Sequence, residues 1–440
     1  MLYEFRRFGL STCNIILFFY TVLSTQSCIA EDKLAPINIQ DTYDNSTNIS
    51  NPLSLKKVIE LAIENNPKVK SAIATLPVAE AKLVITKYIP NPIVGANSEL
   101  IKSGSTHPLQ IGQSLELGRK RYWRVQVAKN EVSKTELEIA KVLWETRAKA
   151  HISYAILSVS KNLIDLANAR LNFYNSLLEI AEKRFHAGDA SGLEIDRTNM
   201  ELLSAENDLD EAGKKLKRAT VELNGLLGQQ VDTQLILEDS EKLKPKTLIS
   251  EYQPIRELIN KAVEKRLEAA ILEKDYGITR ARLKKARWER IPNLYVEGGP
   301  ARPSFHDNIW GPYIGTQVEL PVFNRKQGEI KEAKAQLEYL DKEKIRIENE
   351  INIEVKNALQ DLELSEKQVG RFEQNLLGQS EDILDAIKKG YQIGKLTLTD
   401  VLNAEQKNRD LKQKYLESLL NYQIALASLE YAVGVPIYEQ

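Results

Sequence analysis

The residues that could carry chemistry in this chain of 440 residues are few and scattered. Its four histidines have no metal-ligand spacing with one another. They are His107, His151, His186 and His306. The sequence also lacks the H-E-x-x-H, G-x-S-x-G, Walker and dinucleotide-binding motifs that place catalytic groups or cofactors. We therefore expect neither an enzyme, nor a cofactor, nor a tight metal site.

One short turn segment interrupts sequence that is otherwise highly charged and strongly helical. It reads GYQIGKLTLTDVLNAEQ over residues 390–406. Gly390 and Gly394 are expected to end one helix. Thr397 and Asp400 are expected to begin the next, because their side chains stabilise helix N-termini. The segment therefore predicts a tight turn between two helices.

An earlier turn, RFHAGDASGLEIDRT over residues 184–198, matches this one in a single frame. Gly188 lies about 206 residues before Gly394. At that offset the matching pairs are Ser191 with Thr397, Glu194 with Asp400, and Gly228 with Gly434. A turn repeated in one frame predicts that the chain consists of two related halves, each with a helical hairpin.

The elements that position the two turns recur in the same order in both halves. We expect a first structural repeat over 53–228 and a second over 255–434. The connecting segments are a linker over 31–52, a linker over 229–254 and a C-terminal tail over 435–440. Each repeat should contain short helices, a strand hairpin, a long helix, a glycine turn and a second long helix.

A strand hairpin is expected early in each repeat, at about residues 92–117 and 293–322. Each lies at an Ile-Pro-Asn sequence, residues 89–91 and 291–293, whose proline cannot continue a helix. Apolar residues then alternate in part, over lengths near the ~9–11 residues with which a strand crosses a bilayer. The loops of these hairpins, 102–108 and 300–308, are expected to face the cell exterior.

Four long helices are expected, at about residues 119–186, 193–227, 325–389 and 397–433. The first would extend on the order of 100 Å at ~1.5 Å per residue. The second carries a heptad seam of alternating large and small residues. Its members are Leu202, Leu209, Leu216 and Leu223 with Ala205, Ala212 and Ala219. We expect this seam to be buried against a neighbouring long helix.

Residues 1–30 have the pattern of a secretory signal peptide, with Arg6 and Arg7, an apolar stretch and small residues up to Ala30. Cleavage there would remove both cysteines, Cys13 and Cys28, whereas lipidation of Cys28 is the alternative. The net charge of −1 and the lack of a basic stripe argue against nucleic-acid binding.

The sequence resembles the TolC-like outer-membrane efflux family over nearly the whole chain that follows the signal segment. Three stretches carry this resemblance: LDAIKKGYQIGKLTLTDVLNAEQ from Leu384, RFHAGDASGLEID from Arg184, and QSLELGRKR over residues 113–121. The third is similar to the Glu-Leu-Gly-Lys-Arg signature of the cobalt–zinc–cadmium-resistance branch, which serves heavy-metal RND efflux.

The resemblance implies a mainly α fold with a small β part. Long antiparallel helical hairpins would form a trimeric α-barrel, and four strands per chain would contribute to a closed twelve-stranded β-barrel. The homotrimer would lie in the outer membrane of a Gram-negative bacterium, in contact with its lipid, and extend into the periplasm.

The function implied by the resemblance is that of an exit duct in a tripartite efflux system. The duct would meet a periplasmic adaptor protein and an inner-membrane RND-type pump, and metal cations would be its cargo. The turns would be the docking tips, through Gly188, Ser191, Gly192, Gly390, Gly394 and Thr397.

The resemblance also assigns gate residues. Tyr391, the tyrosine after a turn glycine, would bond an acidic residue of a neighbour, which motif position makes Glu194. Three copies of Asp400 would form a ring of carboxylates that favours cations. The alternative is that Asp400 caps the returning helix and Tyr391 packs in the turn.

Two departures from the family pattern affect this gate. Lys395 stands beside Leu396, which occupies the position where the family can hold a bonding arginine. Asn403 occupies the second acidic position. We therefore expect one acidic ring and a closed state that is less firmly locked.

Other function classes stay open on the sequence alone. A periplasmic coiled-coil scaffold or adaptor would use the hairpins, although it has no use for two strand pairs. Within the duct class, drugs or secreted polypeptides are alternatives to metal cations. The sequence names neither the pump nor the adaptor, and it does not say whether the tip is open or closed.

Overall fold

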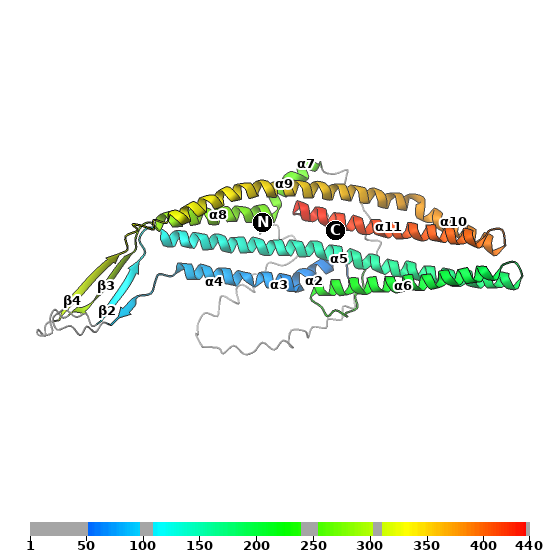
Figure 1. Cartoon of the computed structure of the whole chain (residues 1–440), viewed down its shortest axis with the longest axis horizontal. Coiled ribbons are helices and arrows are strands. Elements are labelled where there is room, and N and C mark those ends of the chain that lie inside the picture. Colours follow the sequence, from blue (N-terminus) through cyan, green and yellow to red (C-terminus); the bar gives the residue numbers. More distant parts are fainter. Residues whose placement is uncertain (1–51, 97–108, 239–253, 302–309, 437–440) are drawn as a thin grey trace. The chain divides into compact units, whose positions relative to one another are not determined.

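The computed structural model describes residues 52–96, 109–238, 254–301 and 310–436 (Figure 1). Several sequence predictions fall outside these residues. They are the signal peptide over 1–30 with Cys13 and Cys28, nearly all of the linker over 31–52, most of the inter-repeat linker, both outer loops almost entirely, and His107 and His306.

Short helices open each half of the described chain. The first half has α2 (Leu55–Asn65), α3 (Pro67–Ile73) and α4 (Thr75–Lys87), and the second has α7 (Ile255–Lys265) and α8 (Leu267–Trp288). Asn66 separates α2 from α3, where Pro67 occupies the first helical position that suits its fixed φ. The amide of Asn66 accepts hydrogen bonds from the backbone of Lys68 and Val69, which caps α3.

The bounds of the long helices lie close to those predicted from the sequence, with one interruption. They are α5 (Lys120–His186), α6 (Gly192–Leu227), α9 (Gln327–Arg371), α10 (Leu377–Gln392) and α11 (Leu398–Val433). The helix expected over 325–389 is divided by a π-helical turn, η5 (Phe372–Leu376). A π turn inserts one residue into the helical period, and no glycine or proline signals it within the turn itself.

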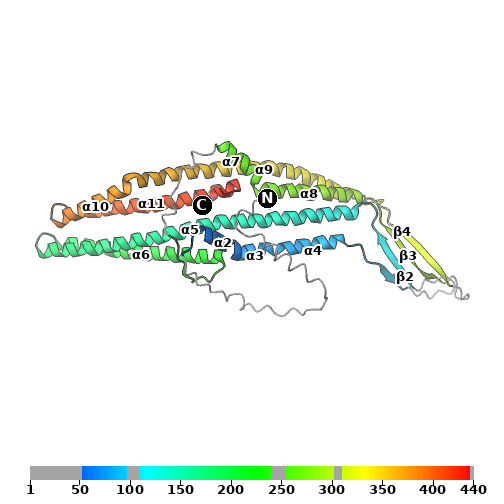
Figure 2. The same cartoon turned by 180° about the vertical axis from the view of Figure 1, so that it is seen from behind.

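The long helices pack side by side, and the core lies between them. Helix α5 contacts α6, α8 and α11, and α9 contacts α11, as Figures 1 and 2 show from opposite sides. The largest buried cluster joins residues of both halves, including Leu223 of α6, Leu362 of α9 and Leu429 of α11. The helices of the two halves therefore share one hydrophobic core.

The heptad seam of α6 is buried through its small residues. Ala205, Ala212 and Ala219 are buried, as is Leu223. Leu202, Leu209 and Leu216 are only half-buried within the single chain. The expected burial therefore holds for the three alanines and for one leucine, on a helix that packs mainly against α5.

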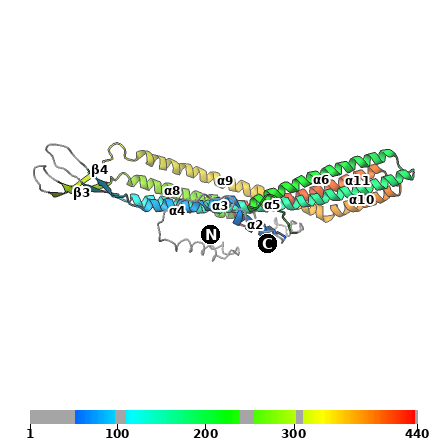
Figure 3. The same cartoon turned by 90° about the horizontal axis from the view of Figure 1, so that it is seen from below.

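The strands form one antiparallel sheet in the order β1-β2-β3-β4. They are β1 (Ile93–Gly95), β2 (Gln110–Leu115), β3 (Leu294–Ala301) and β4 (Gly311–Val318). The hairpins of the two halves join through β2 and β3, where Gly112 faces Glu297. Figure 3 shows the strands at one end of the long helices and the two glycine turns at the other. No described helix is long and apolar enough to span a membrane.

A repeated contact ties the end of each half to its short helices. Gly228 and Gly434 cap α6 and α11 in the left-handed region, with φ of 66° and 77°. A Cβ on Gly228 would lie 2.5 Å from the carbonyl oxygen of Asn65, so only glycine allows this approach. The Asn66 amide donates to Leu226 O at 2.7 Å, and in the second half the Arg266 guanidinium donates to Ala432 O at 3.4 Å.

Candidate gate at the helical turns

The two glycine turns have the same backbone. Gly188 has φ of 80° and Gly394 has φ of 75°, in the left-handed region that glycine adopts without strain. The Gly188 N–H donates to Phe185 O, and the Gly394 N–H donates to Tyr391 O, both at 3.0 Å. Each turn thereby reverses the chain in a few residues.

The helices that leave the two turns are capped differently. Thr397 and Asp400 form a capping box at the start of α11: the Thr397 N–H donates to Asp400 Oδ2 at 2.9 Å, and the Asp400 N–H donates to Thr397 Oγ1 at 3.3 Å. A further bond, from Thr397 Oγ1 to the carboxylate, lowers the pKa of Asp400. Ser191, at the matching position of α6, makes no side-chain cap bond.

Tyr391 is fully buried and joins the two turns. Its hydroxyl donates to Glu194 Oε2 at 2.8 Å, and the Arg184 guanidinium lies 4.4 Å from its ring centroid. Arg184 Nη1 also lies 3.9 Å from Glu194 Oε2. We call Arg184, Tyr391 and Glu194 the tip triad. Burial and the neighbouring carboxylate raise the pKa of Tyr391 to about 12, so its hydroxyl remains a donor at every physiological pH.

The tip triad corrects one part of the sequence interpretation. Tyr391 and Glu194 were expected to bond between neighbouring chains, whereas the structure brings them together within one chain. The reason is that Tyr391 is buried in a cluster with residues of α5, α6 and α11 of the same chain, which the motif alone does not describe. Each chain can therefore hold its own two hairpins together.

The other predicted gate residues are spread over the exposed surface of the second turn. Lys395, Asp400 and Asn403 are all exposed. Sequence reasoning missed a second link between the turns, in which Arg197 Nη1 donates to Thr399 Oγ1 at 3.4 Å. The helix also runs through Gly390 and ends at Gln392, so Gly390 does not itself stop α10.

Sequence reasoning also missed a buried triad farther along α5. The Tyr174 hydroxyl donates to Glu405 Oε2 at 2.8 Å, and Arg170 Nε lies 3.6 Å from Glu405 Oε1. We call Arg170, Tyr174 and Glu405 the upper triad. One signal was present in the sequence. Glu405 falls on the stripe of α11 that also contains the buried Leu398 and Val401, where an acidic residue requires a partner.

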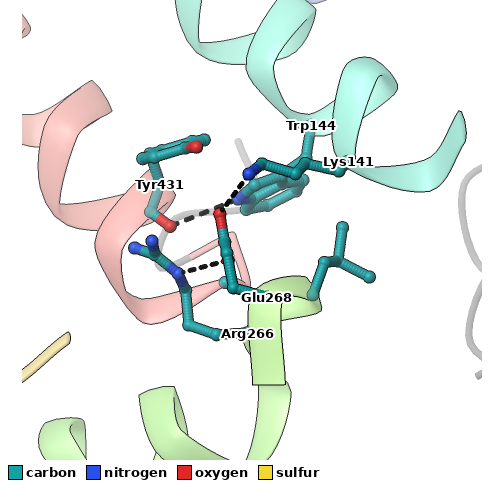
Figure 4. A pocket seen from close by; sticks show the side chains of 7 residues that line it. Lys141, Trp144, Arg266, Glu268 and Tyr431 are labelled. Atoms are coloured by element: carbon teal, nitrogen blue, oxygen red, sulfur yellow. Dashed lines mark hydrogen bonds and ion pairs between the residues drawn. The ribbon is translucent and has the colours of Figure 1, made fainter. Parts of the chain in front are cut away.

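A small pocket lies where α5, α8 and α11 meet, and Figure 4 shows its lining. Arg266 Nε donates to Glu268 Oε2 at 2.9 Å, and Lys141 Nζ lies 3.2 Å from Glu268 Oε1. Trp144 Nε1 donates to Tyr431 O at 3.4 Å. These side chains are paired with one another, so the pocket functions as a packing junction between the two halves.

The described histidines lie apart and differ in setting. His151 is buried and shares a 2.7 Å hydrogen bond with Gln423 Oε1, and burial lowers its pKa. His186 is exposed at the end of α5. Within the described ranges, no group of three or more His, Cys, Asp or Glu side chains is placed to hold a metal ion.

Comparison with known proteins points to one family. Residues 58–229 match the family described as outer membrane efflux protein. The cobalt-zinc-cadmium resistance protein CzcC of Cupriavidus metallidurans is 26% identical over 87% of this chain and 90% of its own length. The outer membrane protein TolC of Escherichia coli is 20% identical over 91% of this chain and 86% of its own length.

Solved structures confirm the expected fold class, mainly helical with a small sheet. The CusC structure has a TM-score of 0.72 with 19% identity, and covers 87% of this chain and 92% of that one. The VceC structure from Vibrio cholerae has a TM-score of 0.70 with 19% identity, and covers 87% of this chain and 97% of that one. With a repeated turn, two long helical hairpins and a four-stranded sheet at their opposite end, this chain has the fold of these channels, and its residues 58–229 match the outer membrane efflux protein family.

Proposed function

We propose that this protein is the exit duct of a tripartite efflux system, and that it passes metal cations from an inner-membrane pump and a periplasmic adaptor to the exterior. The family is one of channels in the outer membrane of Gram-negative bacteria, extending into the periplasm, and this location was expected from the sequence. Beyond this location, the cargo, the gate residues and the partners of the duct are proposed below on separate observations.

The observation that carries the proposal is the hydrogen bond between Tyr391 and Glu194. It joins α10 to α6 beside the two turns, with Arg184 against both partners. A bond that holds two hairpins together at their tips can control how far the hairpins separate. That is the property a gate requires, whereas a static scaffold has no need of a link that can be released.

The proposed assembly is a homotrimer. Within the described residues, β1 and β4 are the outer strands of the sheet and each pairs on one side only. Open strand edges are not tolerated in lipid, because their N–H and C=O groups find no partners. Three copies that join edge to edge would satisfy these groups. Crosslinking in mild detergent should give a trimer, and a ladder that stops at the dimer would contradict this assembly.

The proposed cargo is a divalent metal cation. Two observations support it: the 26% identity to a protein named for cobalt, zinc and cadmium resistance, and the exposed Asp400 at the second turn. Three copies of Asp400 near a threefold axis would attract cations without binding them tightly, which suits release. An exposed carboxylate that caps a helix still attracts cations through its negative charge, so Asp400 can both cap α11 and face the pore.

The proposed docking surface for the adaptor consists of the two turns. Its residues are Gly188, Ser191, Gly192, Gly390, Gly394 and Thr397. A photo-crosslinker placed at Ser191 should capture an adaptor in intact cells. The matched control is a crosslinker at Met200, which is exposed on α6 farther from the turn. Capture from both positions alike would contradict docking at the tips.

Two measurements test the duct and its cargo. In planar bilayers, Tyr391→Phe and Glu194→Gln should raise the conductance of the purified protein, and Asp400→Ala should lower its cation selectivity. In cells lacking the protein, zinc, cobalt or cadmium should accumulate, and the wild-type chain should restore export. Restored export of drugs or of a polypeptide, without metal export, would assign the duct to the alternative cargo.

A further inference from the structure

The upper triad repeats the chemistry of the tip triad at a second level of the helical hairpins. In each, a tyrosine hydroxyl donates to a glutamate at 2.8 Å. In each, an arginine guanidinium stacks near the tyrosine ring, at 5.3 Å in the upper triad and 4.4 Å in the tip triad. Arg170 and Arg184 lie on the same helix, roughly 20 Å apart at ~1.5 Å per residue.

We infer that Arg170, Tyr174 and Glu405 form a second latch, which positions α11 against α5 in the closed duct and must release before the hairpins separate. This inference rests on the proposed gate function. It concerns residues that act through the position of α11, so they are positioning residues and do not themselves line the opening.

The connectivity of the upper triad supports a latch. Arg170 and Tyr174 both lie on α5, in the first half, whereas Glu405 lies on α11, in the second. Every contact between Glu405 and these two residues therefore crosses from one hairpin to the other. If α11 moves away from α5, the Tyr174–Glu405 hydrogen bond must break.

The surrounding charges are also arranged across the hairpins. Arg170 pairs with Glu201 at 3.4 Å and with Asp208, both on α6, while Arg409 of α11 lies 3.5 Å from Asp208. Glu405 is thus surrounded by Arg170 and Tyr174 from α5, by Glu201 from α6 and by Arg409 on its own helix. Arg170 connects three helices, and its side chain is only 5% exposed.

Because Glu405 is buried, loss of its partners and loss of its own charge should have different effects on the latch. The Glu405 side chain is only 6% exposed, and burial raises its pKa despite the nearby Tyr174, Arg170 and Arg409. A buried carboxylate is tolerated only while its partners remain, because an uncompensated buried charge is strongly unfavourable. Loss of Tyr174 or Arg170 should therefore open the duct, whereas loss of the charge on Glu405 should not.

The test is a double-mutant cycle measured as open probability of the full-length protein in planar bilayers. Tyr174→Phe should raise the open probability roughly tenfold, since it leaves the Glu405 carboxylate without its donor. Glu405→Gln should leave the open probability at or below the wild-type value, because glutamine accepts the Tyr174 hydrogen bond and carries no charge. The double variant should return close to the wild type. A merely structural contact would instead make both single variants and the double variant leaky.

The pH profile gives a second readout. The raised pKa of Glu405 means that its protonated form favours the closed, buried arrangement, so closure is favoured at low pH and weakens as pH rises through that pKa. The open probability of Tyr174→Phe should therefore fall on acidification. Glu405→Gln should remove this part of the pH dependence, and an unchanged pH profile in that variant would overturn the inference.

A matched control is a second hydrogen bond from a tyrosine hydroxyl to a carboxylate, between two other helices. The Tyr276 hydroxyl donates to Asp341 Oδ1 at 2.8 Å, between α8 and α9. Tyr276→Phe should leave the open probability unchanged, since this bond does not join α5 to α11.

The tip variants separate this inference from the proposed function. If Tyr391→Phe raises conductance and Tyr174→Phe does not, the second latch is wrong and the gate stands. If neither the wild type nor any tip or latch variant conducts, the proposed duct function itself fails.

Discussion

The tip triad and the upper triad use the same three residue types to hold the two hairpins together, yet they differ in burial. The glutamate side chain is 28% exposed in the tip triad and 6% exposed in the upper triad. The partly exposed Glu194 can exchange its tyrosine partner for water, whereas the buried Glu405 cannot. Identical hydrogen bonds therefore give a readily released contact at the turns and a costly one farther along the helices.

The elements that supply the residues differ as well. In the tip triad, arginine, tyrosine and glutamate come from α5, α10 and α6. In the upper triad, arginine and tyrosine share α5 and glutamate comes from α11. The second hairpin is therefore attached to α5 twice, through both of its helices, so a movement of the turn alone does not free α11.

The largest expected effect is that of Arg170→Met. It removes the guanidinium that lies 3.6 Å from the buried Glu405 carboxylate, and Asp208 loses one of its partners, so we expect a loss of about 3–5 kcal/mol in the free energy of unfolding. Thermal denaturation of the detergent-solubilised protein measures this loss. The matched variant Arg184→Met should cost about 1 kcal/mol or less, since its glutamate reaches solvent. Equal destabilisation by the two variants would contradict a dependence of the contact's strength on burial.

Tyr391→Phe should have an intermediate effect. It removes one hydrogen bond to a partly exposed carboxylate and leaves the buried ring in place, so we expect a loss of about 1 kcal/mol. Thermal denaturation should show a smaller decrease for this variant than for Tyr174→Phe. A decrease at least as large as that of Tyr174→Phe would show that burial of the glutamate does not set the strength of the bond.

The two turns offer a smaller and independent comparison. Thr397→Ala removes the capping box of α11 and should cost about 1 kcal/mol. Ser191→Ala, at the matching position of α6, should cost close to nothing, because Ser191 makes no side-chain cap bond. Hydrogen exchange of the first amides of α11 and α6 reports each effect locally. Faster exchange in α6 after Ser191→Ala would mean that this serine does cap its helix.

The smallest expected effect is the pH dependence of the α11 cap. Hydrogen bonds from Thr397 lower the pKa of Asp400 below its usual 3.8, so the cap stabilises α11 above that usual value and is lost as pH falls through the lowered pKa. Hydrogen exchange at the start of α11 should accelerate below that pKa in the wild type. In Thr397→Ala the acceleration should begin at higher pH, and an unshifted onset would contradict the capping role.

Much of the fold could be predicted from local sequence. The span of α5 followed from a stretch free of glycine and proline, and the turns followed from Gly188 and Gly394 at one repeat offset. The interruption at η5 could not be predicted in this way, because Phe372–Leu376 are ordinary helix residues. Tyr415 of α11 contacts both Phe372 and Glu373, and this contact between distant parts of the chain cannot be read from the local sequence of the π turn.

The residues of the candidate site could likewise be predicted only in part from the sequence. Tyr391, Glu194 and Asp400 became candidates through the resemblance of the turn segments to the efflux family, which implied that the tyrosine bond joins neighbouring chains. Arg170 and Tyr174 were missed because nothing in the long charged run of α5 separates them from solvent-facing residues. Only the buried stripe of α11 marked Glu405 as unusual.

The sequence by itself determined the long helices and the turns, because helical period, capping residues and left-handed glycines act over a few positions. The tertiary structure alone decided which charges are buried and which are paired. Tyr174 and Glu405 are 231 positions apart, and no local rule relates them. Their bond exists because α11 packs against α5 and excludes water from a carboxylate, and that exclusion is a property of the assembled helices.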